Sequence, residues 1–440
     1  MLISVALPLP LFREFTYAAP DRLAARAGVG ARVVVPVRGR RAIGIVVAHA
    51  EPRDDVTPKE ILDAPDDAPA VSAPMLDLAR WISEYYVAPL GMVLRTMLPA
   101  ALGAVRAPTP ARKEVRVARV ARELPSLLER DRLFKRAPKQ RAAYELLESL
   151  GGRAPVDHLV SQLGASPSAV AALGTRGLVA FERQVVSRDP FLSRPAPPAT
   201  AHRLTPAQEA AVHALRRGGG GESFLLHGVT GSGKTLVYVE FLRTVVHDWG
   251  KTAIVLVPEI ALTPQTVDRF RAVFGDRIAV LHSALSDGER YDEWLALKNG
   301  TKRIAVGARS AIFAPLENLG AIVVDEEHEQ SYKQGENPRY HAREVAIVRA
   351  REEGAVVVLG SATPSLESWL NATTGKHRLL ELPQRVGGGR LPDVEVVDLR
   401  AKQKLPQGGG ALDPFRYVIS EALEEALRDR LKKGEQSILL

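Results

Sequence analysis

A glycine-rich segment in the middle of the chain has the spacing of a nucleotide phosphate loop. Residues 228–235 read GVTGSGKT, between an apolar run typical of a strand and a segment typical of a helix. Glycines let backbone N–H groups face phosphate oxygens, the lysine neutralises the β- and γ-phosphates, and the next hydroxyl binds magnesium. We therefore expect ATP and Mg²⁺ as cofactors. The expected nucleotide contacts are Gly228, Val229, Thr230, Gly231, Ser232, Gly233, Lys234 and Thr235.

An acidic cluster follows a later apolar run, AIVVDEEH at 321–328. Asp325 is expected to hold magnesium through coordinated water, together with Thr235, and Glu326 to orient the attacking water. Glu327 and His328 have no role that spacing alone reveals. The expected catalytic residues are Lys234, Thr235, Asp325 and Glu326.

A glutamine precedes the phosphate loop in LTPAQEAAV, residues 204–212. The pattern places Gln208 near the start of a helix. An amide side chain both donates and accepts hydrogen bonds, as the edge of adenine does. We expect Gln208 to contact the adenine base.

These motifs need a sheet that presents them on one edge. Apolar runs typical of strands alternate with helical segments and predict a parallel, doubly wound α/β domain over residues 204–420. In such a sheet, ligands bind beyond the carboxyl ends of the strands, where the motifs lie. The apolar runs are SFLLHG (223–228), TAIVLVP (252–258), RIAVLHS (277–283), RIAVGAR (303–309), AIVVDEE (321–327) and AVVVLGS (355–361).

The first part of the chain predicts a separate, small β-rich domain over residues 1–105. Two β-type runs, at 31–36 and 42–50, are separated by the basic loop RGRR at 38–41. A helix with one apolar face is predicted at 75–86.

Residues 106–190 predict a basic connector and a winged helix. The stretch from Arg106 to Arg141 holds twelve Lys or Arg and four Asp or Glu, an excess as large as the whole chain's net charge of +8. Three helical segments, the second at 154–164, precede a strand pair at 178–188. Winged helices bind DNA or dock proteins, and both remain open. The proline-rich residues 191–203 are expected to form a linker.

Composition limits the remaining possibilities. The 440 residues include no cysteine, which excludes disulfides and thiolate-bound zinc within them. Apolar runs are too short to cross a bilayer, so we expect a cytoplasmic protein with no membrane partner. The positive net charge favours a polyanionic partner.

Several segments resemble a known family. They are similar to the first motor lobe of the primosomal protein N′ family, the bacterial replication-restart helicases of superfamily 2, which have a RecA-like lobe. This resemblance implies an ATP-dependent 3′-to-5′ helicase that recognises stalled or abandoned forks and initiates primosome assembly. The segments are VPEIALTPQ (257–265), LHSALSDGER (281–290), VGARSAIFAP (306–315), DEEHEQSYKQGENPRYHAR (325–343) and LGSATPS (359–365).

The resemblance assigns roles to residues of these segments. It implies sugar–phosphate contacts from Thr263, Gln265, Arg309 and Ser310. An aromatic-rich loop that stacks bases and binds phosphate is implied for Tyr332, Lys333, Arg339, Tyr340 and Arg343, with His341 among them. The family's γ-phosphate sensor, which couples hydrolysis to lobe movement, corresponds to Gly360, Ser361, Ala362 and Thr363.

The N-terminal segment LPLPLFREFTYAAP, residues 7–20, resembles the family's 3′-end DNA-binding domain. Phe15 matches a base-stacking position and Lys59 a phosphate or hydroxyl contact. The family commonly has an acidic residue after the phenylalanine, whereas Thr16 stands here. This departure puts selection for a free 3′-hydroxyl in doubt.

The resemblance also implies parts that these residues lack. The family binds two Zn²⁺ through cysteine pairs and has a second motor lobe, and we expect residues 421–440 to be its start, with GEQSILL (434–440) as a truncated strand. The fragment alone is then expected to bind nucleotide weakly and to unwind nothing. Implied partners are forked and single-stranded DNA, a nascent-strand 3′ end, primosome proteins, single-stranded DNA-binding protein and the replicative helicase loading machinery. The alternatives are a fork-binding adaptor without hydrolysis and a generic superfamily 2 repair translocase.

Overall fold

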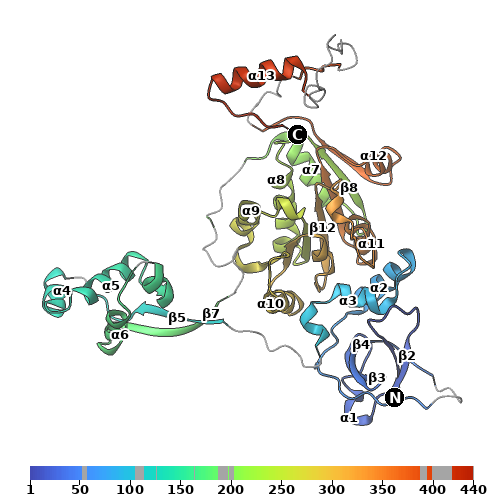
Figure 1. The fold of residues 1–440 in the computed structure, drawn as a ribbon, viewed down its shortest axis with the longest axis horizontal. Helices are drawn as coiled ribbons and strands as arrows, with labels where there is room; N and C mark the ends of the chain where they lie inside the picture. The colour runs from blue at the N-terminus through green and yellow to red at the C-terminus, as the bar shows by residue number, and fades with distance from the viewer. Residues whose placement is uncertain are drawn as a thin grey trace, which may run out of the picture. The chain divides into compact units, whose positions relative to one another are not determined.

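A computed structural model of the chain forms two compact units, Met1–Val386 and Gly387–Leu440, each described by itself (Figure 1). The structure describes residues 1–51, 57–104, 113–124, 126–162, 164–186, 197, 203–386, 394–398 and 419–439.

The largest element of the first unit is a seven-stranded sheet, in which all neighbouring strands are parallel. Its strand order is β10-β11-β9-β12-β13-β8-β14. The chain crosses from β8 to β9, adds β10 and β11 on one side, and then returns through β12 and β13 to β14 at the other edge. The doubly wound fold predicted from the sequence is confirmed. The strands are β8 (Ser223–Gly228), β9 (Thr252–Leu256), β10 (Ile278–Leu281), β11 (Ile304–Gly307), β12 (Leu319–Asp325), β13 (Val356–Ser361) and β14 (Arg378–Leu382).

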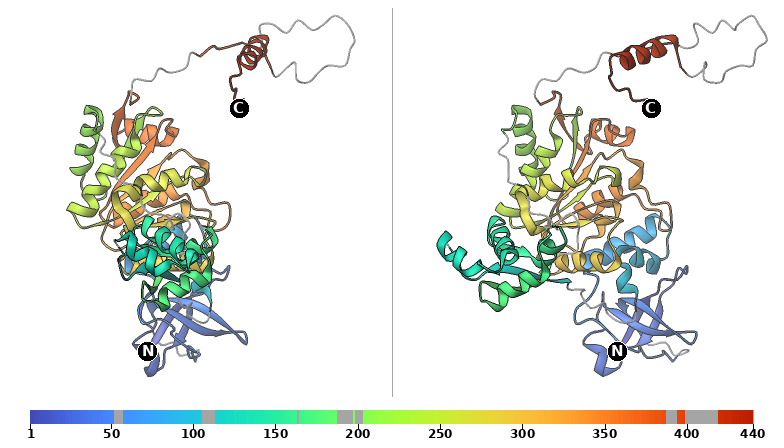
Figure 2. Two further views of the ribbon diagram at one scale, coloured as in Figure 1. Left: turned by 90° about the vertical axis from the view of Figure 1, so that its left-hand side faces the viewer. Right: turned by 60° about the vertical axis from the view of Figure 1, so that its left-hand side comes forward.

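Helices cover both faces of this sheet (Figure 2). Strand residues alternate between the two cores because successive side chains point to opposite faces. One face packs on α7 (Pro206–Arg216), α8 (Lys234–Arg243) and α9 (Pro264–Phe274). The other packs on α10 (Asp287–Lys298), α11 (Ala342–Glu352) and α12 (Leu366–Thr373).

The N-terminal strands form a small closed barrel. Their sheet order is β2-β1-β4-β3, and isolated bridges from Ala18 to Glu60 and from Val34 to Asp63 join its two edges through the segment 60–63. Closure leaves few exposed strand edges. The strands are β1 (Leu2–Ala6), β2 (Phe15–Ala18), β3 (Arg32–Val37) and β4 (Arg40–His49), and the short helix α1 (Asp21–Ala24) connects β2 to β3.

The helices after the barrel share a core with the parallel-sheet domain. Apolar side chains of α2 (Ala73–Tyr85) and α3 (Leu90–Met97) belong to the same buried cluster as Phe313, Tyr340 and Val345. A common core of this kind fixes two domains against each other far better than a polar contact does.

Polar bonds continue the same interface. The buried Arg32 pairs with Asp66 at 2.6 Å and donates to the carbonyl of Leu102 at 2.6 Å. The side chain of Lys298 on α10 donates to the carbonyl of Pro69 at 2.6 Å. The barrel region and the sheet domain are therefore one packed body.

The winged-helix region differs in two places from the sequence expectation. The helix expected at 154–164 is shorter in the structure: β6 (Arg153–Pro155) includes its first two residues, and residues 156–162 are helical, with π-helical geometry from His158 to Gln162. The strand pair expected at 178–188 is a single strand, β7 (Val179–Val186), because its partner is β5 (Lys113–Val120) in the basic connector. The helices are α4 (Leu127–Phe134), α5 (Pro138–Ser149) and α6 (Pro167–Thr175).

The described part of the second unit contains the helix α13 (Glu421–Lys432). Residues 435–439, where a strand was expected, have no regular structure. A strand requires hydrogen bonds to a neighbouring strand, whereas the N–H of Glu435 donates to the carbonyl of Arg430 in the last turn of α13, at 2.9 Å.

The packing of the barrel predicts a stability effect at Gly91 on α3. A Cβ atom there would lie 1.7 Å from the carbonyl oxygen of Leu7, whereas Gly103 has open space around it. We expect Gly91→Ala to lower the free energy of unfolding by about 2 kcal/mol, because a backbone atom must move. Gly103→Ala is the matched control and should change it by less than about 0.5 kcal/mol. Equal values for the two variants in urea denaturation would contradict this packing.

Candidate nucleotide and DNA site

The phosphate loop joins β8 to α8. Gly231 and Gly233 adopt left-handed backbone angles, with φ of 81° and 80°. A Cβ atom on Gly233 would lie 2.3 Å from Nε2 of Gln208, so glycine is required there on two counts. Lys234, the first residue of α8, is buried, and its ammonium group donates to the carbonyl of Gly228 at 2.9 Å.

The loop fits a nucleotide phosphate. The hydroxyl oxygen of Ser232 is buried and has no hydrogen-bond partner among the described residues. A buried polar atom of this kind requires a partner, and a bound phosphate at the helix N-terminus supplies one. Thr230 is exposed, and Val229 and Thr235 are partly exposed on the same turn.

Gln208 lies near the start of α7, as expected from the sequence. Its side chain is buried, accepts from the N–H of Thr205 at 2.9 Å and donates to the carbonyl of Ser232 at 2.8 Å. The amide thus completes the capping box of α7 and supports the phosphate loop. The expected contact of Gln208 with adenine stays a prediction.

Asp325 ends β12 next to the phosphate-loop helix. Its Oδ1 accepts from the hydroxyl of Tyr238 on α8 at 3.1 Å and from the N–H of Glu326 at 3.1 Å. Burial, followed by the charge of Glu326, raises the pKa of Asp325 to about 6. Tyr238 had no role in the sequence reasoning, because nothing in its spacing marks it.

Glu326 turns away from the strand with a left-handed φ of 44°. Such an angle is uncommon outside glycine and directs the side chain out of the strand. Its Oε1 lies 3.8 Å from Nζ of Lys234, so the expected acid and the phosphate-loop lysine share one site. When bound here, Mg²⁺·ATP would be held by Lys234, Thr235 and Asp325, and the metal would supply charge neutralisation at the phosphates.

Glu327 is fully buried and connects three segments. Its carboxylate accepts from Arg343 on α11 at 2.7 Å, from the N–H of Ser365 at 2.7 Å and from the hydroxyl of Ser368 at 2.8 Å. Burial alone would raise the pKa of Glu327, but these hydrogen bonds outweigh it and lower the pKa. The guanidinium of Arg343, expected to contact DNA, is buried in this network and paired with Glu327.

The GSAT segment lies directly against the acidic cluster. The imidazole Nδ1 of His328 is 2.8 Å from the hydroxyl of Ser361, and its Nε2 is 3.5 Å from the hydroxyl of Thr363. A Cβ atom on Gly360 would lie 1.5 Å from the hydroxyl of Tyr238, so glycine makes room for the bond to Asp325. Ala362 is partly exposed beside them.

Two expected stacking rings are core residues. Tyr332 and Tyr340 are each 1% exposed. The hydroxyl of Tyr332 donates to the carbonyl of Asp325 at 2.6 Å, and the ring of Tyr340 packs edge-on against Phe313 at 5.0 Å. These rings cannot stack on bases here, because apolar contacts from both domains already cover them.

The other expected DNA contacts divide into exposed and engaged groups. Arg309 donates to the carbonyls of Ser331 and Lys333 at 3.2 and 2.8 Å and so braces the loop that follows. The hydroxyl of Thr263 caps α9 by accepting from the N–H of Thr266 at 3.3 Å. Gln265, Ser310 and Arg339 are exposed, and the exposed Lys333 also donates from Nζ to the carbonyl of Arg339 at 2.6 Å.

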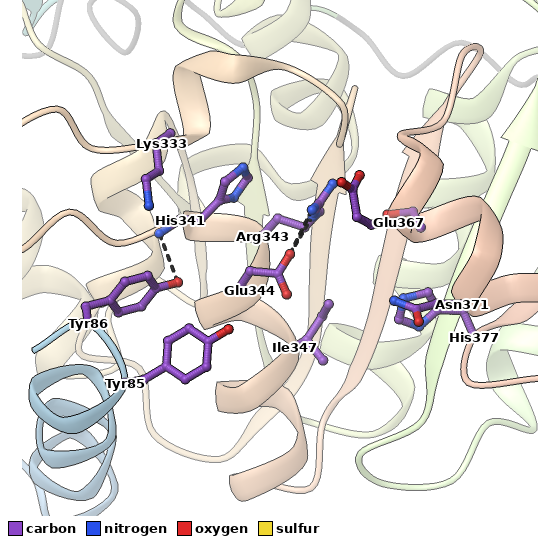
Figure 3. A pocket seen from close by; sticks show the side chains of 11 residues that line it. Tyr85, Tyr86, Lys333, His341, Arg343, Glu344, Ile347, Glu367, Asn371 and His377 are labelled. Carbon is purple, nitrogen blue, oxygen red and sulfur yellow. Dashed lines mark hydrogen bonds and ion pairs between the residues drawn. The ribbon is translucent and has the colours of Figure 1, made fainter.

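A pocket of 490 Å³ is lined by residues of α2, α11, α12 and the loop between the acidic cluster and α11 (Figure 3). The N–H of His341 donates to the hydroxyl oxygen of Tyr86 at 3.2 Å, and Nζ of Lys333 lies 5.3 Å from the centre of the Tyr86 ring. Burial lowers the pKa of both His341 and His377 in its wall. Through these contacts with Tyr86, the loop after the acidic cluster touches the N-terminal region.

The N-terminal candidates lie on β2 and on the segment that pairs with its end. Phe15 is half-buried against the barrel core, and the guanidinium of Arg13 lies 4.8 Å above its ring. Lys59 is exposed, and its carbonyl accepts from the N–H of Ala18 at 2.9 Å. Thr16 is exposed on the opposite face of the strand from Phe15.

Two other features are absent from the described part of the chain. Among the described residues, no group of three or more His, Cys, Asp or Glu side chains is arranged to hold a metal ion, and the sequence has no cysteine. None of the helices described is long and apolar enough to span a membrane.

Comparisons with known families agree with this geometry. Residues 4–99 match the 3′ DNA-binding domain model of PriA, and residues 205–371 match the DEAD/DEAH box helicase model. The chain thus combines a 3′ DNA-binding domain with a helicase domain.

Relatives share this combination. The replication restart protein PriA of Bacillus subtilis (strain 168) is 37% identical over 97% of this chain, and that of Haemophilus influenzae is 35% identical over 100%. The chain belongs to the family of the replication restart protein PriA. It spans 60% and 58% of the length of these two relatives.

Solved structures of other helicases are more distant. The structure of RecG bound to a three-way DNA junction has a TM-score of 0.33 and 21% identity, and covers 43% of this chain and 25% of that chain. The Pyrococcus furiosus Hef helicase domain has a TM-score of 0.31 and 20% identity, and covers 41% and 38%.

The burial of Tyr340 predicts that its loss affects folding. We expect Tyr340→Ala to lower the free energy of unfolding by about 3 to 5 kcal/mol, because it leaves a cavity in a shared core. The neighbouring exposed Arg339→Ala is the control, with a change under about 0.5 kcal/mol. Denaturation followed by circular dichroism measures both, and a fully stable Tyr340→Ala would refute the core assignment.

The environment of Asp325 predicts a pH-dependent stability. The pKa of Asp325 is raised from 3.8 to about 6 on folding, so the unfolded chain loses this proton first and stability falls as the pH rises through that window. We expect Asp325→Asn, without nucleotide or metal, to raise the free energy of unfolding above pH 6 by on the order of 3 kcal/mol. The gain should shrink toward pH 4. A gain in the free energy of unfolding that does not change with pH would contradict a pKa of Asp325 raised by burial.

Proposed function

We propose that the protein is an ATP-dependent 3′-to-5′ DNA helicase that recognises stalled or abandoned replication forks and initiates primosome assembly for replication restart. The observation that carries this proposal is the pairing of a 3′ DNA-binding domain with a helicase domain in one packed body. Such a body suits a protein that binds a DNA end and moves on the adjoining strand.

The nucleotide side of the proposal assigns roles within the phosphate loop and acidic cluster. Lys234 and the backbone of residues 228–233 hold the phosphates, and Asp325 holds the magnesium ion together with Thr235. Glu326 orients the attacking water and accepts its proton. The distance of 3.8 Å between Lys234 and Glu326 supports a common site.

The DNA side uses exposed groups of the same domain. Gln265, Ser310, Lys333 and Arg339 are proposed as backbone contacts, because their side chains are accessible and none is acidic. The GSAT segment, residues 360–363, is proposed to sense the γ-phosphate, and His328 is proposed to connect it to the acidic cluster through Ser361 and Thr363. Phe15 and Lys59 are proposed to hold the strand end.

Partners and location follow from the family assignment. We propose forked DNA with a nascent-strand 3′ end as ligand, and primosome proteins, single-stranded DNA-binding protein and the replicative helicase loading machinery as protein partners, in the cytoplasm at the nucleoid. Two Zn²⁺ are proposed for the whole protein, bound by ligands outside these 440 residues.

Unwinding tests the proposal directly. A protein containing this chain at the length of its relatives should unwind a fork with a recessed 3′ end only with ATP and Mg²⁺. Glu326→Gln should lower ATP hydrolysis by roughly 10²- to 10⁴-fold, because the water loses its base, while fork binding measured by fluorescence anisotropy stays within about twofold.

The alternative is a fork-binding adaptor that does not hydrolyse ATP. Fork binding without unwinding, and without any difference between wild type and Glu326→Gln in ATP turnover, would establish the adaptor. Unwinding without preference for forks over simple partial duplexes would instead favour a general repair translocase.

A further inference from the structure

One end of the N-terminal barrel carries an exposed ring and four exposed arginines. β1 ends and β2 begins there, and β3 turns into β4 at the same end, because β1 is antiparallel to both β2 and β4. The connection 7–14 and the hairpin tip 38–41 therefore flank one rim. The rim side chains used below are Phe12, Arg13, Arg38, Arg40 and Arg41.

Phe12 is the exposed aromatic residue of this rim. Its side chain is 69% exposed, and no other phenylalanine among the described residues is classed as exposed. Phe15, by contrast, packs on the barrel core and has the guanidinium of Arg13 over its ring.

The segment that presents Phe12 is held in place. Pro8 and Pro10 restrict its backbone, and the N–H groups of Leu9 and Leu11 donate to carbonyls two residues earlier. Its start lies so close to α3 that Gly91 has no room for a side chain. An exposed ring on a rigid support loses little entropy on stacking.

The hairpin tip adds positive charge at a conformational cost. Arg38 has a left-handed φ of 46°, followed by Gly39 at 78°, in a turn where asparagine, aspartate or glycine is favoured at the first position. Arg38, Arg40 and Arg41 are all exposed, and none is paired with a described carboxylate. The nearby carboxylate of Glu14 accepts from the hydroxyl of Ser4 at 2.5 Å.

We propose that Phe12 stacks on a base of the nucleotides next to the strand terminus, while Arg38, Arg40 and Arg41 contact their phosphates. Aromatic rings interleaved with cations bind single strands without regard to sequence. The inference rests on the proposed function, since it extends end binding beyond the terminal nucleotide. It also gives the strained arginine of the hairpin a role.

Stacking is tested with the 440-residue chain and a fork whose recessed 3′ end carries 2-aminopurine beside the terminal nucleotide. The wild type should quench the fluorophore on binding. Phe12→Leu should lose the quench and bind roughly tenfold more weakly, whereas Phe12→Trp should retain both. Because the side chain is exposed, the melting temperature should not change.

The arginines are tested through the salt dependence of binding. Replacing Arg38, Arg40 and Arg41 by Gln should reduce the slope of log Kd against log salt by roughly two, at about 0.7 per lost contact with a single strand. Replacement of Arg22 and Arg26, exposed residues on and just after α1 at the opposite barrel end, by Gln is the control and should leave the slope unchanged.

Different results would overturn the stacking site at Phe12 and the end recognition of the proposed function. Unchanged quenching and affinity in Phe12→Leu overturn the stacking site, even if the protein still prefers forks that end in 3′-hydroxyl over 3′-phosphate. Equal wild-type affinity for both ends and for a fork without a recessed end overturns end recognition in the proposed function. Loss of quenching in Phe12→Leu with the same intact end preference supports both.

Discussion

The buried ion pair between Glu327 and Arg343 is the contact on which the rest of the site depends. It joins the turn after β12, the first turn of α11 and the start of α12, three segments far apart along the chain. An isolated carboxylate in this position would be very costly, and the pair is tolerable because serine hydroxyls and a backbone N–H complete its hydrogen bonds. The acidic cluster is thereby fixed relative to the GSAT segment.

The same network explains how DNA contacts could affect the nucleotide site. Arg343 follows the loop that Arg309 braces, and that loop touches Tyr86 of the N-terminal region. A shift of the loop therefore moves atoms bonded to Glu327, next to the expected catalytic Glu326. No base needs to stack on Tyr332 or Tyr340 for this connection, because both rings are part of the packed core that transmits it.

The shared core of α2, α3 and the helicase domain gives the barrel a fixed position. A barrel attached by a linker would search for a strand end independently of the motor, whereas a packed one presents its rim at a constant place on the helicase domain. Buried Arg32, with Asp66 and the carbonyl of Leu102, holds the segment that leads out of this region. Under the proposed function, end binding and translocation would act on one strand with a defined geometry.

The sequence by itself determined the phosphate loop, the acidic strand end and the parallel sheet, because glycine angles, strand hydrophobicity and the order of motifs are local properties. Only the tertiary structure decided that Tyr332, Tyr340 and Arg343 are buried and that Gln208 supports the loop. Those outcomes depend on which distant side chains cover each residue, and spacing carries no information about that. For the same reason, the sequence did not predict the roles of Tyr238 and Glu327, whose partners lie 87 and 16 residues away along the chain.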